Sequence, residues 1–134
     1  PKDMPTEQDM NVPTPVYEHP EVKALCDFFQ PYVGRSHFLK IPPGGYFPPH
    51  RDFKSLQLNS FRIIVPLMNM EYPRFTFMLE DKILPWEKGA VYFLNTAKTH
   101  HLFNAGIEDA YMIVLNIETN KEVIQKVLDN LAIR

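Results

Sequence analysis

Two side chains near the end of the segment FLKIPPGGYFPPHRD, residues 38–52, have types and spacing that suit a metal ion. His50 and Asp52 lie two positions apart in an expected strand, so both side chains should leave the same face. A neutral imidazole and a carboxylate on one face can supply two adjacent ligands to a divalent metal. The same spacing also occurs at solvated strand ends, so a third ligand is needed to indicate a site.

A third ligand is available in the segment NTAKTHHLFNAG, where His100 and His101 open another short strand. Neighbouring residues of a strand point to opposite faces, so only one of these histidines can face the site. That histidine would complete the 2-His-1-carboxylate face that suits ferrous iron and leaves coordination positions open. His19 and His37 have no partner at a ligand spacing, and we expect both to be structural or solvated.

The elements that must position these ligands are short strands. Thirteen prolines and five glycines in 134 residues argue against a mostly helical chain. Breaker sequences separate most of the apolar segments, and we predict eight strands, at 36–41, 46–52, 61–68, 74–80, 82–84, 89–95, 99–104 and 110–117. Short strands at roughly ten-residue spacing indicate a sandwich or barrel. The last strand is apolar on both faces and should therefore be central.

Helices are expected on either side of this β-core, which spans residues 36–117. Residues 1–19 are predicted to form an extended arm, followed by a helix at 20–32 in which Cys26 is a small buried hydrophobe. A second helix is predicted at 120–132, with Thr119 as its cap. Its apolar stripe should pack on the outer face of the sheet and consists of Val123, Ile124, Val127, Leu128 and Leu131.

The overall composition describes one folded domain, residues 1–134, of ordinary globular character. The net charge of -2 gives no electrostatic reason to expect nucleic acid or an anionic membrane as a partner. No apolar run approaches the roughly 18 residues of a membrane span. A single cysteine excludes an internal disulfide and a cysteine-rich zinc site. We expect a soluble cytoplasmic protein that acts on a small molecule or a peptide, and the sequence indicates no oligomeric state.

The order of these motifs resembles the aspartyl/asparaginyl β-hydroxylase and proline 3-hydroxylase branch of the Fe(II)/2-oxoglutarate oxygenases, over roughly residues 36–117. That pattern has a Pro-Gly turn before the metal histidine and an arginine at the start of an apolar strand, here Arg62 in FRIIVPL. A second histidine follows eleven residues after a glycine. Counting from Gly89 selects His100 over His101. A carboxylate at the position of Asp52 resembles the proline-hydroxylase members.

The resemblance implies a double-stranded β-helix, which is a cupin-like jelly roll, with the two helices packed outside. It further implies a non-haem Fe(II) dioxygenase that uses 2-oxoglutarate to hydroxylate an aliphatic carbon of an amino acid or a peptidyl side chain. The iron would be held by His50, Asp52 and His100, and no catalytic residue beyond these ligands is indicated.

One departure from the family pattern concerns the far carboxylate of 2-oxoglutarate. The family arginine that pairs with this group would fall on Ala110, and a helper hydroxyl would fall on Leu39. Arg62 is therefore the candidate for cofactor binding, because a guanidinium offers a bidentate fork to a carboxylate. Weaker candidates are Lys40, Arg74 and Lys98. The departure leaves two alternatives open: a cupin-like metal enzyme that does not use 2-oxoglutarate, and a catalytically silent binding module.

Overall fold

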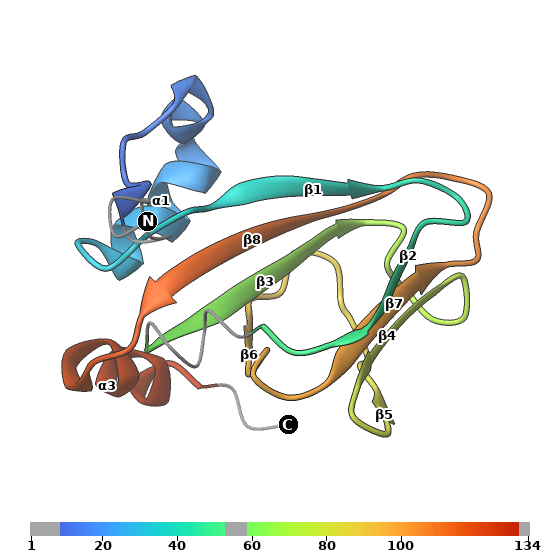
Figure 1. Cartoon of the computed structure of the whole chain (residues 1–134). Coiled ribbons are helices and arrows are strands. Elements are labelled where there is room, and N and C mark those ends of the chain that lie inside the picture. The colour runs from blue at the N-terminus through green and yellow to red at the C-terminus, as the bar shows by residue number, and fades with distance from the viewer. Residues whose placement is uncertain (1–8, 53–58, 132–134) are drawn as a thin grey trace, which may run out of the picture.

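A computed structural model describes residues 9–52 and 59–131 of the chain and is mainly β, with helices near both ends (Figure 1). Each of the eight predicted strands has a counterpart, with shifted ends. The elements in chain order are a 3-10 turn η2 (Pro15–Glu18), α1 (Pro20–Phe29), β1 (His37–Ile41), β2 (Tyr46–His50), β3 (Ser60–Met68), β4 (Phe75–Leu79), β5 (Lys82–Ile83), β6 (Tyr92–Leu94), β7 (His100–Asn104), β8 (Ala110–Glu118) and α3 (Lys121–Asp129).

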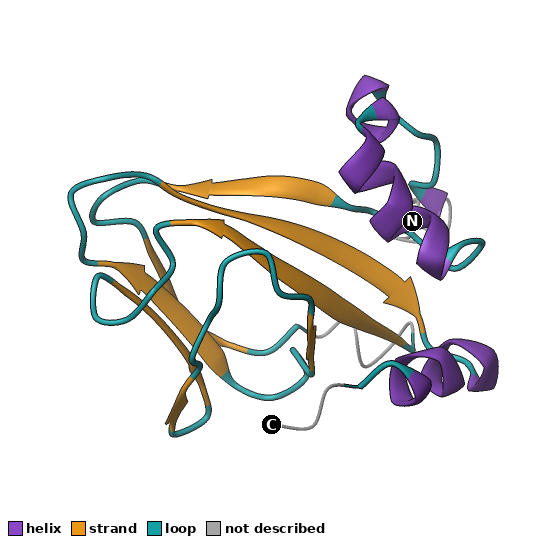
Figure 2. Cartoon of the chain, turned by 180° about the vertical axis from the view of Figure 1, so that it is seen from behind, coloured by secondary structure: helices purple, strands orange, loops and turns teal. Residues whose placement is uncertain are grey.

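The strands form two antiparallel four-stranded sheets. The first sheet has the order β1-β8-β3-β6, and the second has the order β2-β7-β4-β5. The last strand, β8, lies between β1 and β3, which confirms the prediction that it is central. Both helices lie at the same end of the sheets, as Figure 2 shows from the opposite side. The mainly β fold with two flanking helices is therefore as predicted.

Residues of β8 alternate between two hydrophobic cores, which explains why both of its faces are apolar. Met112 and Val114 face the inner core between the two sheets, together with side chains such as Phe77 of β4. Leu115 and Ile117 face an outer core that includes buried residues of α1 and α3. Cys26 is one of the buried residues of α1, as predicted. One strand thus ties the sheet sandwich to the helices.

The connection between β1 and β2 moves the chain from one sheet to the other through Pro42-Pro43-Gly44-Gly45. Gly44 has a φ of +77°, in the left-handed region that favours glycine. A Cβ on Gly45 would lie only 2.6 Å from the Cγ2 atom of Ile41. This tight turn starts β2, the strand that ends at the candidate site.

The N-terminal segment differs from the expected extended arm where the structure describes it. Pro15–Glu18 form a 3-10 turn, with proline at its first position, where the missing N–H costs nothing. The hydroxyl of Tyr17 donates a hydrogen bond to Asp27 and so ties this turn to α1. Residues 1–8 of the expected arm lie outside the described residues. Among the helices of the described chain, none is long and apolar enough to cross a membrane.

The helix ends also differ from prediction. The first helix ends at Phe29 instead of residue 32, because Gln30 precedes Pro31 and adopts the extended conformation that this position favours. The second helix begins at Lys121, and its cap is Asn120 instead of Thr119. The Asn120 side-chain oxygen accepts a hydrogen bond from the Val123 N–H at 2.9 Å.

The predicted apolar stripe of α3 is only partly buried. Val123 is fully buried, and Ile124 and Val127 are partly buried against the outer core. Leu128 is 58% exposed, and Leu131, which follows the end of the helix at Asp129, is 57% exposed. The helix therefore contacts the sheet mainly through its first two turns.

Candidate metal centre

The three predicted ligands come together at one end of the second sheet. His50 ends β2 and lies directly opposite His100, the first residue of β7. Asp52 follows two residues after His50, beyond the end of the strand. Its Oδ1 atom lies 3.4 Å from Nε2 of His50 and 3.6 Å from Nε2 of His100. The potential ligand atoms all lie within 4.8 Å of one another, which makes the three residues a candidate metal site.

A β-bulge places His50 on the face of the sheet that carries His100. Phe47 pairs with Leu102, and His50 pairs with His100, so between these pairs β2 advances three residues while β7 advances two. Opposed residues of an antiparallel pair share a face. In a regular strand, Phe47 and His50 would point to opposite faces, and the extra residue returns His50 to the face of Phe47. The Pro48-Pro49 pair lies in this irregular stretch.

Backbone carbonyls orient both imidazole rings. Nδ1 of His50 lies 2.7 Å from the Pro48 carbonyl oxygen, and Nδ1 of His100 lies 2.9 Å from the Lys98 carbonyl oxygen. A carbonyl can only accept, so Nδ1 carries a proton in each ring, and Nε2 is the nitrogen that a metal would use. This pattern is the usual second-shell arrangement of metal-binding histidines. Burial lowers the pKa of His100, which favours the neutral form that a metal ligand requires.

The two carboxylate oxygens of Asp52 have different partners. Oδ2 accepts a hydrogen bond from Nε of Arg62 at 2.8 Å, within an ion pair whose side chains are 17% and 15% exposed. Oδ1 faces the two histidines. The backbone of Asp52 is also held, because its N–H donates to the Thr96 carbonyl oxygen at 2.9 Å. The aspartate is thus fixed at both its main chain and its side chain.

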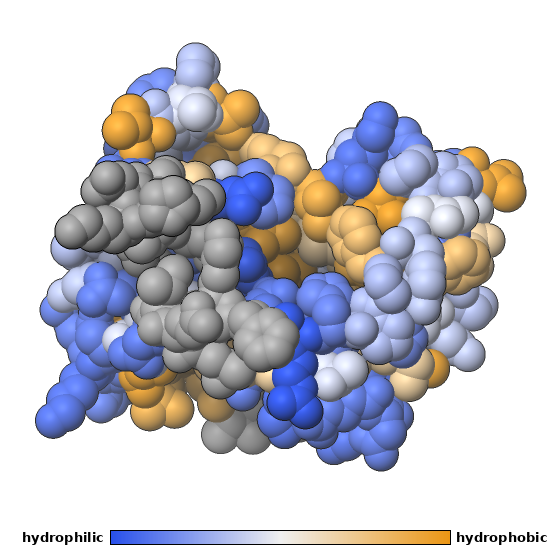
Figure 3. All heavy atoms as spheres, in the orientation of Figure 1, coloured by the Kyte–Doolittle hydropathy of each residue, from blue (hydrophilic) through white to orange (hydrophobic). Residues whose placement is uncertain are grey.

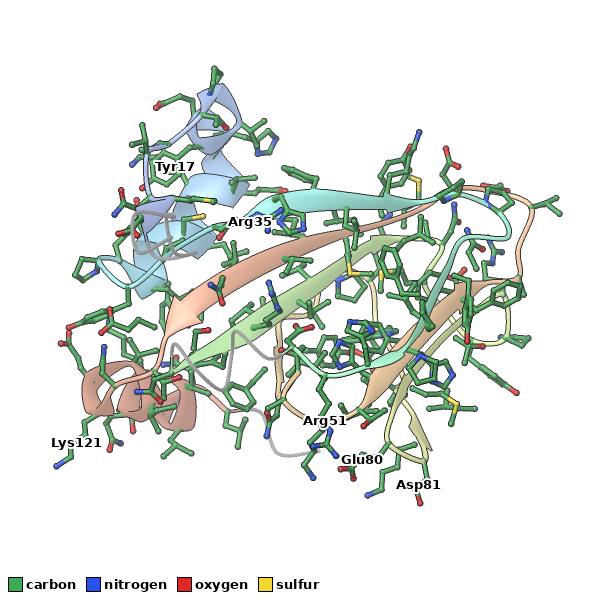
Figure 4. All side chains as sticks on the ribbon, viewed as in Figure 1. Tyr17, Arg35, Arg51, Glu80, Asp81 and Lys121 are labelled. Atoms are coloured by element: carbon green, nitrogen blue, oxygen red, sulfur yellow. The ribbon has the colours of Figure 1, made fainter. Side chains whose placement is uncertain are left out.

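His101 lies outside this cluster of potential ligands. It follows His100 on β7 and is paired with Met78 of β4, so its side chain leaves the opposite face from that of His100. Arg51, between the two ligands of the His-x-Asp pair, is exposed and lies at the end of β2 near the turn that carries Glu80 and Asp81 (Figure 4).

A cavity of about 260 Å³ adjoins the cluster. Much of its wall is apolar and comes from both sheets: Leu39, Phe47, Ile64, Phe77, Leu94, Leu102, Met112 and Val114. Figure 3 shows a hollow on the face of the molecule seen in Figure 1, with hydrophobic side chains on its floor and hydrophilic side chains along its lower rim. Such an environment excludes water from one side of the candidate site.

The basic residues considered for carboxylate recognition differ in whether they line the cavity. Arg62 lines the cavity, and no other lysine or arginine in the described part of the chain does so. Lys40 is exposed on β1, Arg74 pairs with Glu71, and Lys98 pairs with Glu80, all away from the cavity. Ala110 and Leu39 occupy the positions where the family has an arginine and a hydroxyl. Ala110 is fully buried in the inner core, and Leu39 lines the cavity.

His37 also lines the cavity, although its position in the sequence predicts a structural or solvated histidine. It is the first residue of β1, and its side chain leaves the same face as those of Leu39 and Ile41 because the three alternate along the strand. This period-two relation to Leu39, a position already assigned to the neighbourhood of the site, is the signal that could have identified it.

No protein-family model and no curated protein sequence matches the chain. Three similar solved structures are a predicted oxalate decarboxylase from Thermotoga maritima (21% identity, TM-score 0.51, 72% of this chain and 73% of that one), the cupin domain of Schizosaccharomyces pombe Cnp3 (11%, 0.51, 72% and 59%), and a cupin domain from Bordetella pertussis (16%, 0.50, 66% and 83%). Similarity at these identities establishes the fold alone. The two facing antiparallel sheets, the central β8 and these similarities together give the chain the cupin fold, with a His-Asp-His cluster suited to a metal ion.

Proposed function

We propose that this chain is a non-haem Fe(II)- and 2-oxoglutarate-dependent oxygenase that hydroxylates an aliphatic carbon of an amino acid or a peptidyl side chain. The observation that carries the proposal is the convergence of Nε2 of His50, Nε2 of His100 and Oδ1 of Asp52 beside an apolar cavity. The motif order along the chain supports the oxygenase class, and the cupin fold is compatible with it.

The donor set fits a ferrous ion. Two imidazole nitrogens and one carboxylate oxygen form the set typical of non-haem iron oxygenases, which leaves positions open for other ligands. Two donors at about 2.1 Å from one ion lie roughly 3.0 to 3.4 Å apart for octahedral and tetrahedral angles. The spacings of 3.4 and 3.6 Å between Asp52 and the two imidazole nitrogens are close to this range.

Each residue has a distinct task in this proposal. When bound, the iron supplies the redox chemistry that couples oxidative decarboxylation of 2-oxoglutarate to hydroxylation of a substrate C–H bond. His50, Asp52 and His100 hold the ion, and the apolar wall keeps water from the reacting groups. Arg62 supplies the positive charge that a carboxylate in this cavity requires, since an unpaired buried carboxylate is strongly disfavoured.

A second candidate function is a cupin-type metal enzyme that does not use 2-oxoglutarate. Two observations favour it: the guanidinium of Arg62 is bonded to Asp52, and the position of the family arginine is occupied by the buried Ala110. In this alternative, Arg62 serves only the metal site. A binding module without catalysis would need neither metal nor co-substrate.

Anaerobic titration with Fe(II) and then with 2-oxoglutarate distinguishes the three functions. The oxygenase is expected to bind one equivalent of metal and then to develop the visible charge-transfer band of a bidentate 2-oxo acid chelate. Succinate lacks the 2-oxo group and serves as the control that should give no band. Metal binding without the band would favour the second candidate, and no metal binding would favour the binding module.

A further inference from the structure

We propose that Arg62 is a positioning residue that holds Asp52 in its metal-binding orientation. This inference rests on the proposed metal site and assigns Arg62 a task in addition to recognition of the co-substrate. The sequence alone predicts for Arg62 only a contact with the carboxylate of 2-oxoglutarate. The guanidinium carries five N–H donors, and the one on Nε makes the bond to Asp52.

The geometry of the carboxylate gives the first argument. Arg62 Nε binds Oδ2 of Asp52 at 2.8 Å, whereas Oδ1 lies 3.4 and 3.6 Å from the two imidazole Nε2 atoms. An ionic hydrogen bond to one oxygen restricts rotation of the carboxylate and directs the other oxygen toward the ion. Partners of this kind orient metal ligands in many proteins.

The positions of the two residues in the fold give the second argument. Arg62 belongs to β3, where it pairs with Asn116 of β8 on one side and with Leu94 of β6 on the other. Asp52 follows the end of β2 in the opposite sheet. Asp52, which lies outside any strand, is therefore hydrogen-bonded to Arg62, a residue inside the opposite sheet. Both side chains are mostly buried, which strengthens the pair relative to one in water.

Charge and geometry predict opposite effects for the loss of this arginine. A positive charge close to a cation site repels the ion, so removing it should by itself strengthen metal binding. If Arg62 orients Asp52, its removal should weaken metal binding instead. A loss of metal affinity on removal of Arg62 therefore indicates a positioning role, and a gain indicates only electrostatic repulsion of the ion.

Metal affinity of the apoprotein for Co(II) or Mn(II) is the measurement. Arg62→Ala is expected to weaken binding by about 10- to 100-fold, the usual effect of losing a second-shell partner. Arg62→Lys should recover part of this loss, because a lysine can still donate an ionic hydrogen bond to Asp52 but lacks the planar guanidinium that fixes its direction. The control is Arg51→Ala, which removes the same charge from the exposed neighbour of Asp52 and should leave the affinity unchanged or slightly higher.

A double-mutant cycle shows whether Arg62 acts through Asp52. In the Asp52→Ala background, Arg62→Ala should cause no further loss of affinity, because the group it orients is gone. The visible spectrum of bound Co(II) should change in Arg62→Ala and return toward the parent spectrum in Arg62→Lys. Circular dichroism and thermal unfolding of each apoprotein verify the fold. If the alanine variant is unfolded, Arg62→Gln, which retains most of the side-chain volume, replaces it in the cycle.

Unchanged or tighter metal binding by a folded Arg62→Ala or Arg62→Gln variant would overturn the inference, and so would an equal loss in the presence and absence of Asp52. Failure of the proposed function is recognised separately. If the parent chain binds no metal, or if His50→Ala retains full affinity, then the proposed metal site is wrong, and the inference falls with it.

Discussion

At the scale of single residues, the candidate site depends on which atom of each side chain is left available. His50 and His100 each direct Nδ1 to a carbonyl two residues earlier in the chain, so Nε2 is the available nitrogen in both. The two carboxylate oxygens of Asp52 also differ: Oδ2 accepts a hydrogen bond from Arg62, and Oδ1 faces the histidines. All three ligands are thus oriented by partners before an ion binds, which reduces the cost of organising the site.

The adjacent histidines offer a direct test of this assignment. His100→Ala should lower affinity for Mn(II) or Co(II) by about 100-fold or more, because losing a ligand costs more than losing a second-shell partner. His101→Ala removes the same side chain one residue later, on the opposite face of β7, and should leave the affinity unchanged. Isothermal titration of both variants makes the comparison. Equal losses in the two variants would contradict the assignment of His100.

At the scale of elements, local irregularities determine what each strand and helix presents. The bulge in β2 places His50 on the same face of the sheet as His100. The side chain of Asn120 caps the N-terminus of α3. The backbone explains why the adjacent Thr119 is not the cap: its N–H bonds to the Asn59 carbonyl oxygen at 2.7 Å, so this residue still belongs to the connection from β8.

The cap of α3 can be tested by a matched pair of substitutions. Asn120→Ala removes the acceptor of the Val123 N–H and should lower the free energy of unfolding by about 1 kcal/mol. Thr119→Ala changes the adjacent residue, whose side chain is not the cap, and should change this free energy by less than about 0.5 kcal/mol. Urea denaturation followed by circular dichroism measures both values. A larger loss for Thr119→Ala would restore the cap predicted from sequence.

At the scale of the whole molecule, the metal cluster borders the inner core through the cavity, whereas the outer core does not line that cavity. The inner core lies between the sheets, and the outer core lies between β3, β8 and the helices. Both consist of buried apolar side chains, and hydrophobic burial is the dominant favourable term in folding. The cluster lies at one end of the second sheet, and we therefore expect the fold to persist without an ion, unlike that of a zinc finger.

A chelator should therefore remove the metal without unfolding the chain. The bound ion contributes only its mass-action term, about 2.7 kcal/mol at a free concentration one hundred times the dissociation constant. Excess EDTA should lower the thermal midpoint of the metal-loaded protein and leave the far-ultraviolet circular dichroism spectrum at room temperature unchanged. Added metal should restore the midpoint. Collapse of the β-type spectrum on chelation would show that the ion is part of the fold.

The sequence by itself determined the elements that depend on local pattern. Proline and glycine breakers at roughly ten-residue spacing predicted eight strands, the doubly apolar segment at 110–117 predicted that the last one is central, and the structure has that arrangement. The spacing of His50 and Asp52 also predicted that their side chains meet, and they do, although β2 ends at His50 and Asp52 lies just beyond the strand. These features are encoded within a few residues of each other.

Tertiary structure decided everything that required two distant segments to be placed against each other. The bulge depends on the register between β2 and β7, the bond from Arg62 to Asp52 crosses between the sheets, and His37 reaches the cavity only through the pairing of β1 with β8. Register and sheet packing are set by the sum of many long-range contacts. Local residue types therefore indicated which side chains can bind a metal, and the fold determined which partners orient them.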